Sequence, residues 1–213
     1  MKLGKFITLE GIEGAGKSTA LQFIRDYFAE KHQEILVTRE PGGTSLSEEI
    51  RQLILHPKSD EVMLADTELL LMFAARAQHI KHCLRPALEA GKWVVSDRYI
   101  DASYAYQGGG RQVNLNHIKV LDEMIVGELY PDLTLLLDLS VDLGMARTEQ
   151  RNSQKDRIEK EQIDFFIRIR KAYLERAKQD PNRIKIIDAS KTVMDVSKQI
   201  RLILDQAFPV PIA

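Results

Sequence analysis

The 213-residue chain is short of several features, and each shortage excludes a class of protein. It has one cysteine, Cys83, so neither an intramolecular disulfide framework nor a zinc site built from several cysteines is available to it. The longest wholly apolar run, Leu69 to Ala75, falls far short of the roughly 18 residues that cross a bilayer. The apolar stretch at residues 6–9 is too short for a secretory signal. We therefore expect a cytoplasmic protein that does not enter the membrane.

An excess of charge of one sign is also lacking. Lys and Arg number 30 and Asp and Glu number 31, which leaves a net charge of −1. Without a basic excess, the composition predicts no nucleic-acid partner, and any site for an anion must be local. A chain of this length can bury about 70% of its unfolded surface, which is enough for a sizeable core. We find no repeat and no linker, and we expect a single domain over residues 1–213.

Short strand-like runs alternate with longer helical patterns along the chain. Apolar and β-branched runs predict strands at residues 6–9, 35–38, 93–97, 133–138 and 184–187. Helical spacing of apolar residues predicts helices at 18–31, about 46–55, 66–90 and from 193 onward. We expect Gly91 to end the third helix and Pro86 to kink it. This alternation is typical of an α/β fold. It predicts a mainly parallel sheet of five strands with helices on both faces.

Residues 11–18 read Gly-Ile-Glu-Gly-Ala-Gly-Lys-Ser and match the phosphate-binding pattern G-x-x-x-x-G-K-[ST]. They lie between a predicted strand and a predicted helix, where backbone N–H groups and the helix N-terminus can surround an anion. Lys17 would reach the β and γ phosphates, and the Ser18 hydroxyl would bind Mg²⁺. A chance glycine turn is the alternative, but eight matching positions in this setting predict nucleoside triphosphate binding. The expected ATP contacts are Gly11, Ile12, Glu13, Gly14, Ala15, Gly16, Lys17, Ser18 and Thr19.

A second group of charged residues follows the predicted strand at 93–97. Asp97 at its carboxyl end can hold Mg²⁺ through water, and the planar guanidinium of Arg98 can bind a phosphate. A surface ion pair beside a packed Tyr99 explains the same residues, and they do not choose between the two by themselves. Further arginines stand in separate motifs, at Arg39, Arg51 and Arg76.

Six motifs in this order resemble those of bacterial thymidylate kinases over nearly the whole chain. They are residues 11–18, Arg-Glu-Pro-Gly-Gly-Thr at 39–44, Phe-Ala-Ala-Arg at 73–76, Asp-Arg-Tyr at 97–99, Tyr-Gln-Gly-Gly-Gly-Arg at 106–111 and Asp-Arg-Ile-Glu at 156–159. The resemblance implies a three-layer fold of the P-loop NTPase type and a homodimer. It also implies Mg²⁺-dependent transfer of the γ-phosphoryl group of ATP to thymidine monophosphate (dTMP), in the supply of thymidine triphosphate.

The same resemblance implies an acceptor site. Arg39, Arg51 and Arg98 correspond to ligands of the acceptor phosphate, and Glu13 corresponds to a contact with the sugar 3′-hydroxyl. Glu40 would orient the arginines. The residues implied to bind dTMP are Glu13, Arg39, Glu40, Arg51, Phe73, Arg76, Asp97, Arg98, Ser103, Tyr106 and Gln107.

At the base, the resemblance implies that Arg76 donates to a carbonyl and that Ser103 and Gln107 are polar partners. Tyr106 would crowd the sugar 2′ position and select deoxyribose. In many relatives the phenylalanine that stacks on the base lies four residues before the arginine, where this chain has Met72. Phe73 lies three residues before it, and both offsets face the arginine on a helix. We favour Phe73, with Met72 as the alternative.

The polar stretch at residues 147–162 by itself indicates a solvated loop, and the resemblance implies a lid over the site. No arginine lies between Gly11 and Lys17, so the resemblance places the catalytic arginines in this lid, at Arg151 and Arg157. Together with Lys17 and Arg98 they form the implied catalytic set. Arg147 would stack on adenine or lie on a helix surface.

Two other functions remain open from the sequence. A kinase for another nucleoside monophosphate would differ only in its contacts to the base. A nucleotide-dependent switch would use the phosphate loop to signal to a partner protein. The Asn-Lys-x-Asp motif of guanine switches and the Leu-Ser-Gly-Gly-Gln motif of transporter ATPases are both absent from the sequence.

Overall fold

The computed structural model describes residues 4–58, 61–150 and 156–209. Five parallel strands form one sheet in the order β2-β3-β1-β4-β5. Their bounds are β1 Phe6–Glu10, β2 Ile35–Arg39, β3 Trp93–Asp97, β4 Leu133–Asp138 and β5 Ile184–Asp188. The prediction of a five-stranded parallel sheet is confirmed, and each predicted strand lies within one residue of the observed bounds.

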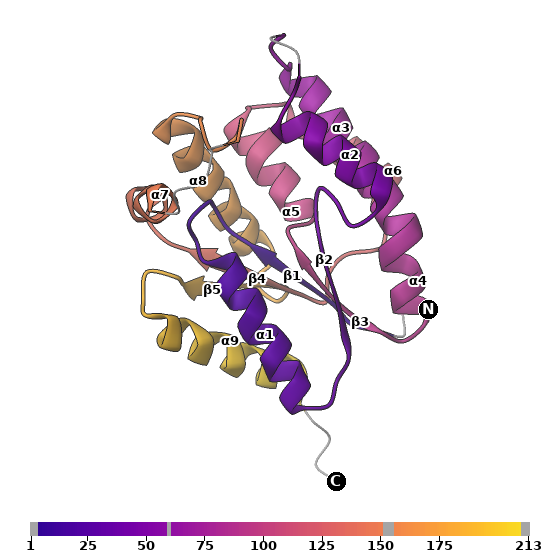
Figure 1. Ribbon diagram of the computed structural model, residues 1–213, viewed down its shortest axis with the longest axis vertical. Coiled ribbons are helices and arrows are strands. Elements are labelled where there is room, and N and C mark those ends of the chain that lie inside the picture. The colour runs from indigo at the N-terminus through magenta and orange to yellow at the C-terminus, as the bar shows by residue number, and fades with distance from the viewer. Residues whose placement is uncertain (1–3, 59–60, 151–155, 210–213) are drawn as a thin grey trace.

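Helices cover both faces of this sheet (Figure 1). The α-helices are α1 Lys17–Glu30, α2 Ser45–Leu55, α3 Ala65–His79, α4 Arg85–Glu89, α5 Ile100–Ser103, α6 Leu115–Ile125, α7 Val141–Glu149, α8 Ile163–Gln179 and α9 Val193–Ala207. Neighbouring strand residues face opposite layers: Ile7 joins the core cluster beneath α1, and Phe6 joins the cluster beneath α4 and α6. The period-2 alternation of strands thus builds a core on each side.

The predicted helix at 66–90 is one helical run with a wider turn in its middle. Segment η1 (Ile80–Leu84) is π-helical and joins α3 to α4. Pro86 lies in the first turn of α4. Because proline has no N–H, it cannot bond back to the preceding turn, and the wider η1 turn accommodates its ring.

A second π-helical segment, η2 (Tyr104–Gly110), continues α5 and packs along α8. A Cβ on Gly109 would lie 2.7 Å from the Cβ of Ala172 and 2.9 Å from the carbonyl oxygen of Arg168. Only glycine allows the two backbones to come this close. This packing fixes the position of Tyr106 and Gln107, which η2 carries.

The carboxyl ends of the strands meet at one edge of the sheet. Leu9 pairs with Asp97, and Arg39 pairs with the same aspartate from the other side. The chain leaves β1 at this edge and enters the phosphate-binding motif. Within the part of the chain that the structure describes, every helix falls short of the length and apolar character needed to span a membrane.

Candidate active site

The phosphate-binding motif forms a loop between β1 and α1 that packs against α7. Gly14 has a φ of +73°, and a Cβ there would lie 2.0 Å from the carbonyl oxygen of Gly144. Gly16 begins α1 without a side-chain hydrogen bond to the first turn. The first-turn N–H groups therefore have no side-chain acceptor, and the helix N-terminus is available to an anion.

Lys17 lies across this loop. Its Nζ donates to the carbonyl oxygens of Gly11 and Ile12, each at 3.1 Å. Burial, reinforced by the nearby Arg98 guanidinium, lowers the pKa of Lys17 to about 8. A phosphate bound in the loop would supply the negative charge that restores the preference for the charged form.

Gly14 and Gly16 of the phosphate loop each line two cavities, one on either side. The first, which we call the α2–α3 cavity, is also lined by Glu13, Lys17, Ser18, Glu40, Pro41, Arg51, Ile54, Leu55, Glu68, Met72, Asp97, Arg98, Ala102, Tyr106, Gln107, Asp156, Ile158 and Glu159. The second, the α7–α9 cavity, is also lined by Ala15, Thr19, Ala20, Arg147, Ala189, Lys191, Val193, Val196 and Ser197. The loop thus forms a shared wall between two binding spaces.

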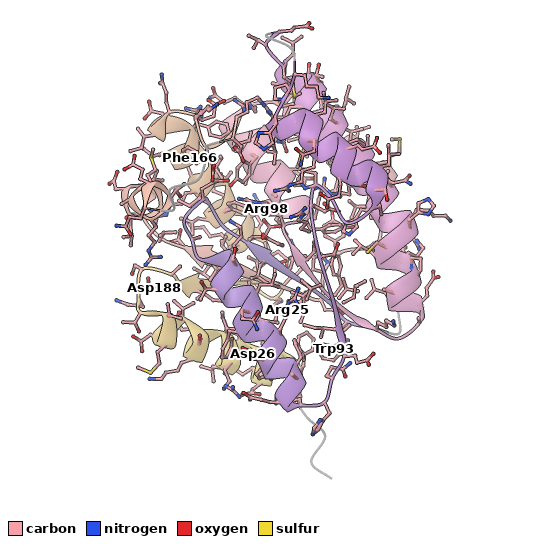
Figure 2. All side chains as sticks on the ribbon, viewed as in Figure 1. Arg25, Asp26, Trp93, Arg98, Phe166 and Asp188 are labelled. Atoms are coloured by element: carbon pink, nitrogen blue, oxygen red, sulfur yellow. The ribbon has the colours of Figure 1, made fainter. Side chains whose placement is uncertain are left out.

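Arg98, Glu13 and Tyr106 form one cluster beside the loop. Arg98 Nη2 donates to Glu13 Oε1 at 2.9 Å, and its Nη1 donates to the carbonyl oxygen of Gly11 at 3.0 Å. The Tyr106 hydroxyl lies 2.8 Å from both carboxylate oxygens of Glu13. The Arg98 guanidinium also stacks 4.5 Å from the Tyr106 ring centroid. Figure 2 shows Arg98 near the centre of the molecule.

The two other arginines expected at an acceptor phosphate lie in different places. Arg51 lines the α2–α3 cavity, and its Nη1 donates to the carbonyl oxygen of Pro41 at 2.9 Å. Arg39 is exposed and forms a two-point ion pair with Glu48, at 2.8 Å and 3.2 Å. The structure therefore brings Arg51 and Arg98 to the cavity and leaves Arg39 outside it.

Asp97 and Ser18 have the donor atoms that Mg²⁺ prefers. Both line the α2–α3 cavity. Asp97 Oδ1 is buried, and no group in the described part of the chain bonds to it. Hard oxygen donors and an unpaired carboxylate oxygen beside a phosphate loop fit a magnesium ion that keeps most of its ligands as water and phosphate.

Arg76 lies behind the cavity wall in a network of buried hydrogen bonds. Its three nitrogens donate to Glu40 Oε2 at 2.7 Å, Ser103 Oγ at 2.9 Å and the carbonyl oxygen of Tyr99 at 2.9 Å. His79 Nδ1 donates to the other Glu40 oxygen at 2.8 Å. Burial opposes the charge on His79, but the contacts with Cys83 and Glu40 outweigh it and raise the pKa of His79 to about 9. Glu40 thus holds two cations.

Met72 and Phe73 occupy different environments. Met72 lines the α2–α3 cavity. Phe73 is buried in the core cluster that contains Phe6 and Tyr99, with the Arg76 guanidinium 4.7 Å from its ring centroid. The structure therefore differs from the expectation that Phe73 covers the base, since Met72 has the position on the cavity surface.

Gln107 and Arg157 meet at Glu68, a residue that the sequence analysis did not single out. Glu68 is buried on α3 and accepts from Gln107 Nε2 at 2.8 Å and from Arg157 Nη2. Arg157 Nε also donates to the carbonyl oxygen of Ile54 at 2.8 Å. The structure thus places Arg157 against α2 and α3, whereas the prediction had it at the transferring phosphoryl group.

The remaining expected lid residues are only partly described. Arg147 belongs to α7, and its Nη1 donates to the carbonyl oxygen of Ala189 at 2.9 Å, on the wall of the α7–α9 cavity. Arg151 lies outside the described residues, so its expected catalytic role stays a prediction.

The sequence contains a signal for cavity-lining residues that the sequence analysis did not select. Glu68, Met72 and Arg76 are spaced four apart on α3 and so share one face of the helix. That spacing extends the Arg76 motif two turns back toward the helix start. On the other side, Ala189 and Lys191 directly follow β5 at the carboxyl edge of the sheet, where ligands of such sheets gather.

Comparisons with known proteins agree with one another. Residues 9–200 match the protein family described as thymidylate kinase. A thymidylate kinase of Ruthia magnifica is 54% identical over 204 residues, which cover 96% of this chain and 98% of that protein. One of Nitrosospira multiformis is 51% identical over 197 residues, covering 92% and 95%. The crystal structure of thymidylate kinase from Ehrlichia chaffeensis superimposes with a TM-score of 0.76 at 30% identity, covering 94% of this chain and 98% of that one.

Proposed function

The chain belongs to the thymidylate kinase family, and we propose that its two cavities bind the two substrates of that enzyme on either side of the phosphate loop. The protein is a dTMP kinase with a P-loop α/β fold, and it transfers the γ-phosphoryl group of ATP to dTMP to give dTDP and ADP. In our assignment, dTMP binds in the α2–α3 cavity and the adenosine of ATP in the α7–α9 cavity. The observation that carries this assignment is that Gly14 and Gly16 line both cavities.

The acceptor phosphate lies, in this proposal, between Arg51 and Arg98. Two anionic substrates repel each other, and guanidinium groups at the meeting point reduce that repulsion. Arg39 stays paired with Glu48 and acts only through its charge. The acceptor phosphate is ionised near neutral pH, so transfer needs no strong general base and no covalent enzyme intermediate.

Lys17 and Arg98 stabilise the negative charge of the transferring group, because both already lie at the phosphate loop. Mg²⁺, when bound, neutralises charge on the ATP phosphates, and we propose that Ser18 holds it directly and Asp97 through water. Arg157 anchors the described end of the expected lid, residues 156–162, to α2 and α3 through Glu68 and the carbonyl oxygen of Ile54.

At the nucleoside, we propose that Glu13 accepts from the sugar 3′-hydroxyl and that Tyr106 fills the space a 2′-hydroxyl would need. Tyr106 is held on Glu13 by its hydroxyl, so it cannot easily move aside. Met72 packs on the base. Gln107 contacts the base edge. Arg76 and Ser103 are bonded to each other behind the cavity wall and support that edge from there.

We also propose a cytoplasmic homodimer. Helix α3 packs between α2 and α6, and all three carry exposed apolar side chains. These are Leu46, Leu53, Leu70, Leu115, Val120 and Met124. Exposed apolar side chains on three neighbouring helices support a protein interface there.

Replacing Arg51 with alanine tests the acceptor assignment. Losing a charge-assisted hydrogen bond costs about 1.5–3 kcal/mol, so the Arg51→Ala KM for dTMP should rise roughly 10- to 150-fold. The KM for ATP should stay near the wild-type value, because Arg51 lines only the α2–α3 cavity. The exposed Arg85 on α4 provides a matched control, Arg85→Ala. Equal increases in both KM values would contradict the assignment.

A further inference from the structure

The amide of Gln107 has one polar atom bonded and the other unpaired. Gln107 is 2% exposed and lines the α2–α3 cavity. Its Nε2 donates to Glu68 Oε1 at 2.8 Å. Its Oε1 is buried, and no donor in the described part of the chain reaches it. A buried carbonyl oxygen without a donor costs stability, so its presence in a cavity wall indicates a ligand that donates a hydrogen bond.

The contacts of Glu68 determine which way this amide faces. Glu68 is 1% exposed, and its Oε2 accepts from Arg111 Nε at 3.0 Å and from Arg157 Nη2. A carboxylate bound by two guanidinium groups accepts hydrogen bonds and donates none. If the amide were reversed, its oxygen would face the Glu68 oxygen and the pair would repel. The Gln107 nitrogen must therefore face Glu68, which leaves the oxygen for the base.

We propose that Glu68 is a positioning residue that selects the base by fixing the orientation of the Gln107 amide. This inference rests on the proposed binding of dTMP in the α2–α3 cavity. Thymine and uracil carry an N–H at ring position 3, which donates to the fixed Gln107 oxygen. Cytosine carries a lone pair at that position, which the same oxygen repels. Glu68 thus acts on specificity without contacting the base.

Glu68 also forms ion pairs with Arg157 of the lid and with Arg111, which Glu161 binds as well, and these pairs support the fold. A purely structural Glu68 would affect the lid and the stability of the fold whatever residue stands at position 107. The two roles therefore differ in whether the effect of Glu68 depends on the Gln107 amide.

The test is a double-mutant cycle with Glu68→Gln and Gln107→Leu. The readouts are the Kd for dTMP and the Ki for dCMP, with the Kd for ATP and the unfolding temperature followed alongside. A glutamine at position 68 can either accept or donate, so the Gln107 amide is free to reverse. We expect Glu68→Gln to weaken dTMP binding about tenfold. The ratio of the dCMP Ki to the dTMP Kd, which measures base preference, should fall by a similar factor. In the Gln107→Leu background, the same change should have no further effect on either constant.

The opposite results are equally specific. If Glu68→Gln weakens dTMP binding by the same factor with leucine at position 107, Glu68 acts through the lid or the fold and the inference is overturned. If Gln107→Leu alone leaves dTMP binding and base preference unchanged, the proposed base site fails instead. If Glu68→Gln does not fold, Glu68→Asp can replace it in the test. Aspartate keeps the negative charge, but its shorter side chain places the carboxylate farther from the Gln107 amide. It should reproduce the loss of dTMP affinity, and an unchanged dTMP Kd would again overturn the inference.

Discussion

Lys17 is a cation in a partly buried position, and its burial decides how the phosphate loop responds to pH. Its pKa is lowered to about 8 by burial and by the neighbouring Arg98. In the absence of ATP, the side chain is charged below pH 8 and loses its proton above it. ATP binds the charged form, so ATP binding and proton uptake are coupled above pH 8.

The first prediction follows from this coupling. The Kd of the wild-type enzyme for ATP should increase as the pH rises above about 8, approaching tenfold per pH unit. Calorimetry at pH 8.5 in buffers of different ionisation enthalpy should detect uptake of a proton on binding. In Lys17→Arg, whose guanidinium stays charged, the Kd should be higher but nearly independent of pH between 8 and 9.5. An equal pH dependence in the two proteins would show that another group is responsible.

Single residues also mark where sequence analysis reaches its limit. The phosphate loop and the arginine motifs were recognisable because their chemistry requires fixed residue types at fixed spacings. Met72 and Phe73 were not separable, because residues three and four positions before Arg76 both face it on a helix, and only packing decides which of them reaches the cavity. Glu68 was missed for a related reason: on a helix, an acidic residue usually indicates an exposed position.

Among the elements, η2 depends most on close packing. Its glycines let it lie directly on α8, and its π-helical turn carries Tyr106 and Gln107 on the cavity wall. Wider helical turns are frequent at functional sites. The spacing of apolar residues cannot reveal such a turn. A π-helical turn holds one more residue than an α-helical turn, and that extra residue leaves no distinct pattern in the sequence. The five strands, by contrast, followed from their apolar runs, and α1, α2, α3 and α9 followed from the helical spacing of their apolar residues, whereas α6 and α7 were not predicted.

The second prediction concerns this packing. In Gly109→Ala the new Cβ would meet the Arg168 carbonyl at 2.9 Å, so η2 must move away from α8. We expect the variant to lose about 1–3 kcal/mol in the free energy of unfolding. Its KM for dTMP should be higher than that of the wild-type protein. Gly108→Ala is the matched control, since its nearest neighbours are the flexible side-chain ends of Leu115 and Ile118. Thermal unfolding and steady-state kinetics measure both effects, and equal losses in the two variants would contradict this account of η2.

At the scale of the whole molecule, the sequence predicted the position of the site at the sheet edge, but it did not predict the surfaces that depend on how the helices pack. The α/β architecture and the position of the site followed from the sequence, because parallel strands place their carboxyl ends together. The two-sided arrangement of cavities around the loop did not, since it depends on how α2, α3, α7 and α9 pack. The exposed apolar side chains of α2, α3 and α6 became visible only once those helices lay side by side.

The third prediction tests the proposed dimer. The wild-type protein should have twice the chain mass in light scattering after gel filtration. Leu70→Glu places a charge on the exposed apolar surface of α3 and should give a monomer. Leu202→Glu, on the exposed surface of α9, should leave the dimer intact. A monomeric wild-type protein would contradict the proposed dimer. A dimer that withstands Leu70→Glu but not Leu202→Glu would place the interface elsewhere.

The most direct test of the central claim is to offer each nucleoside monophosphate separately, in ribose and deoxyribose forms, and to measure ADP release with ATP and Mg²⁺. We predict the highest kcat/KM for dTMP. We also predict a markedly lower kcat/KM for the corresponding ribonucleotide, because Tyr106 is held on Glu13 where a 2′-hydroxyl would lie. A preference for another base would leave the phosphate loop assignment standing but contradict the assigned base site. No stimulation by any monophosphate would contradict the assignment of the α2–α3 cavity as an acceptor site.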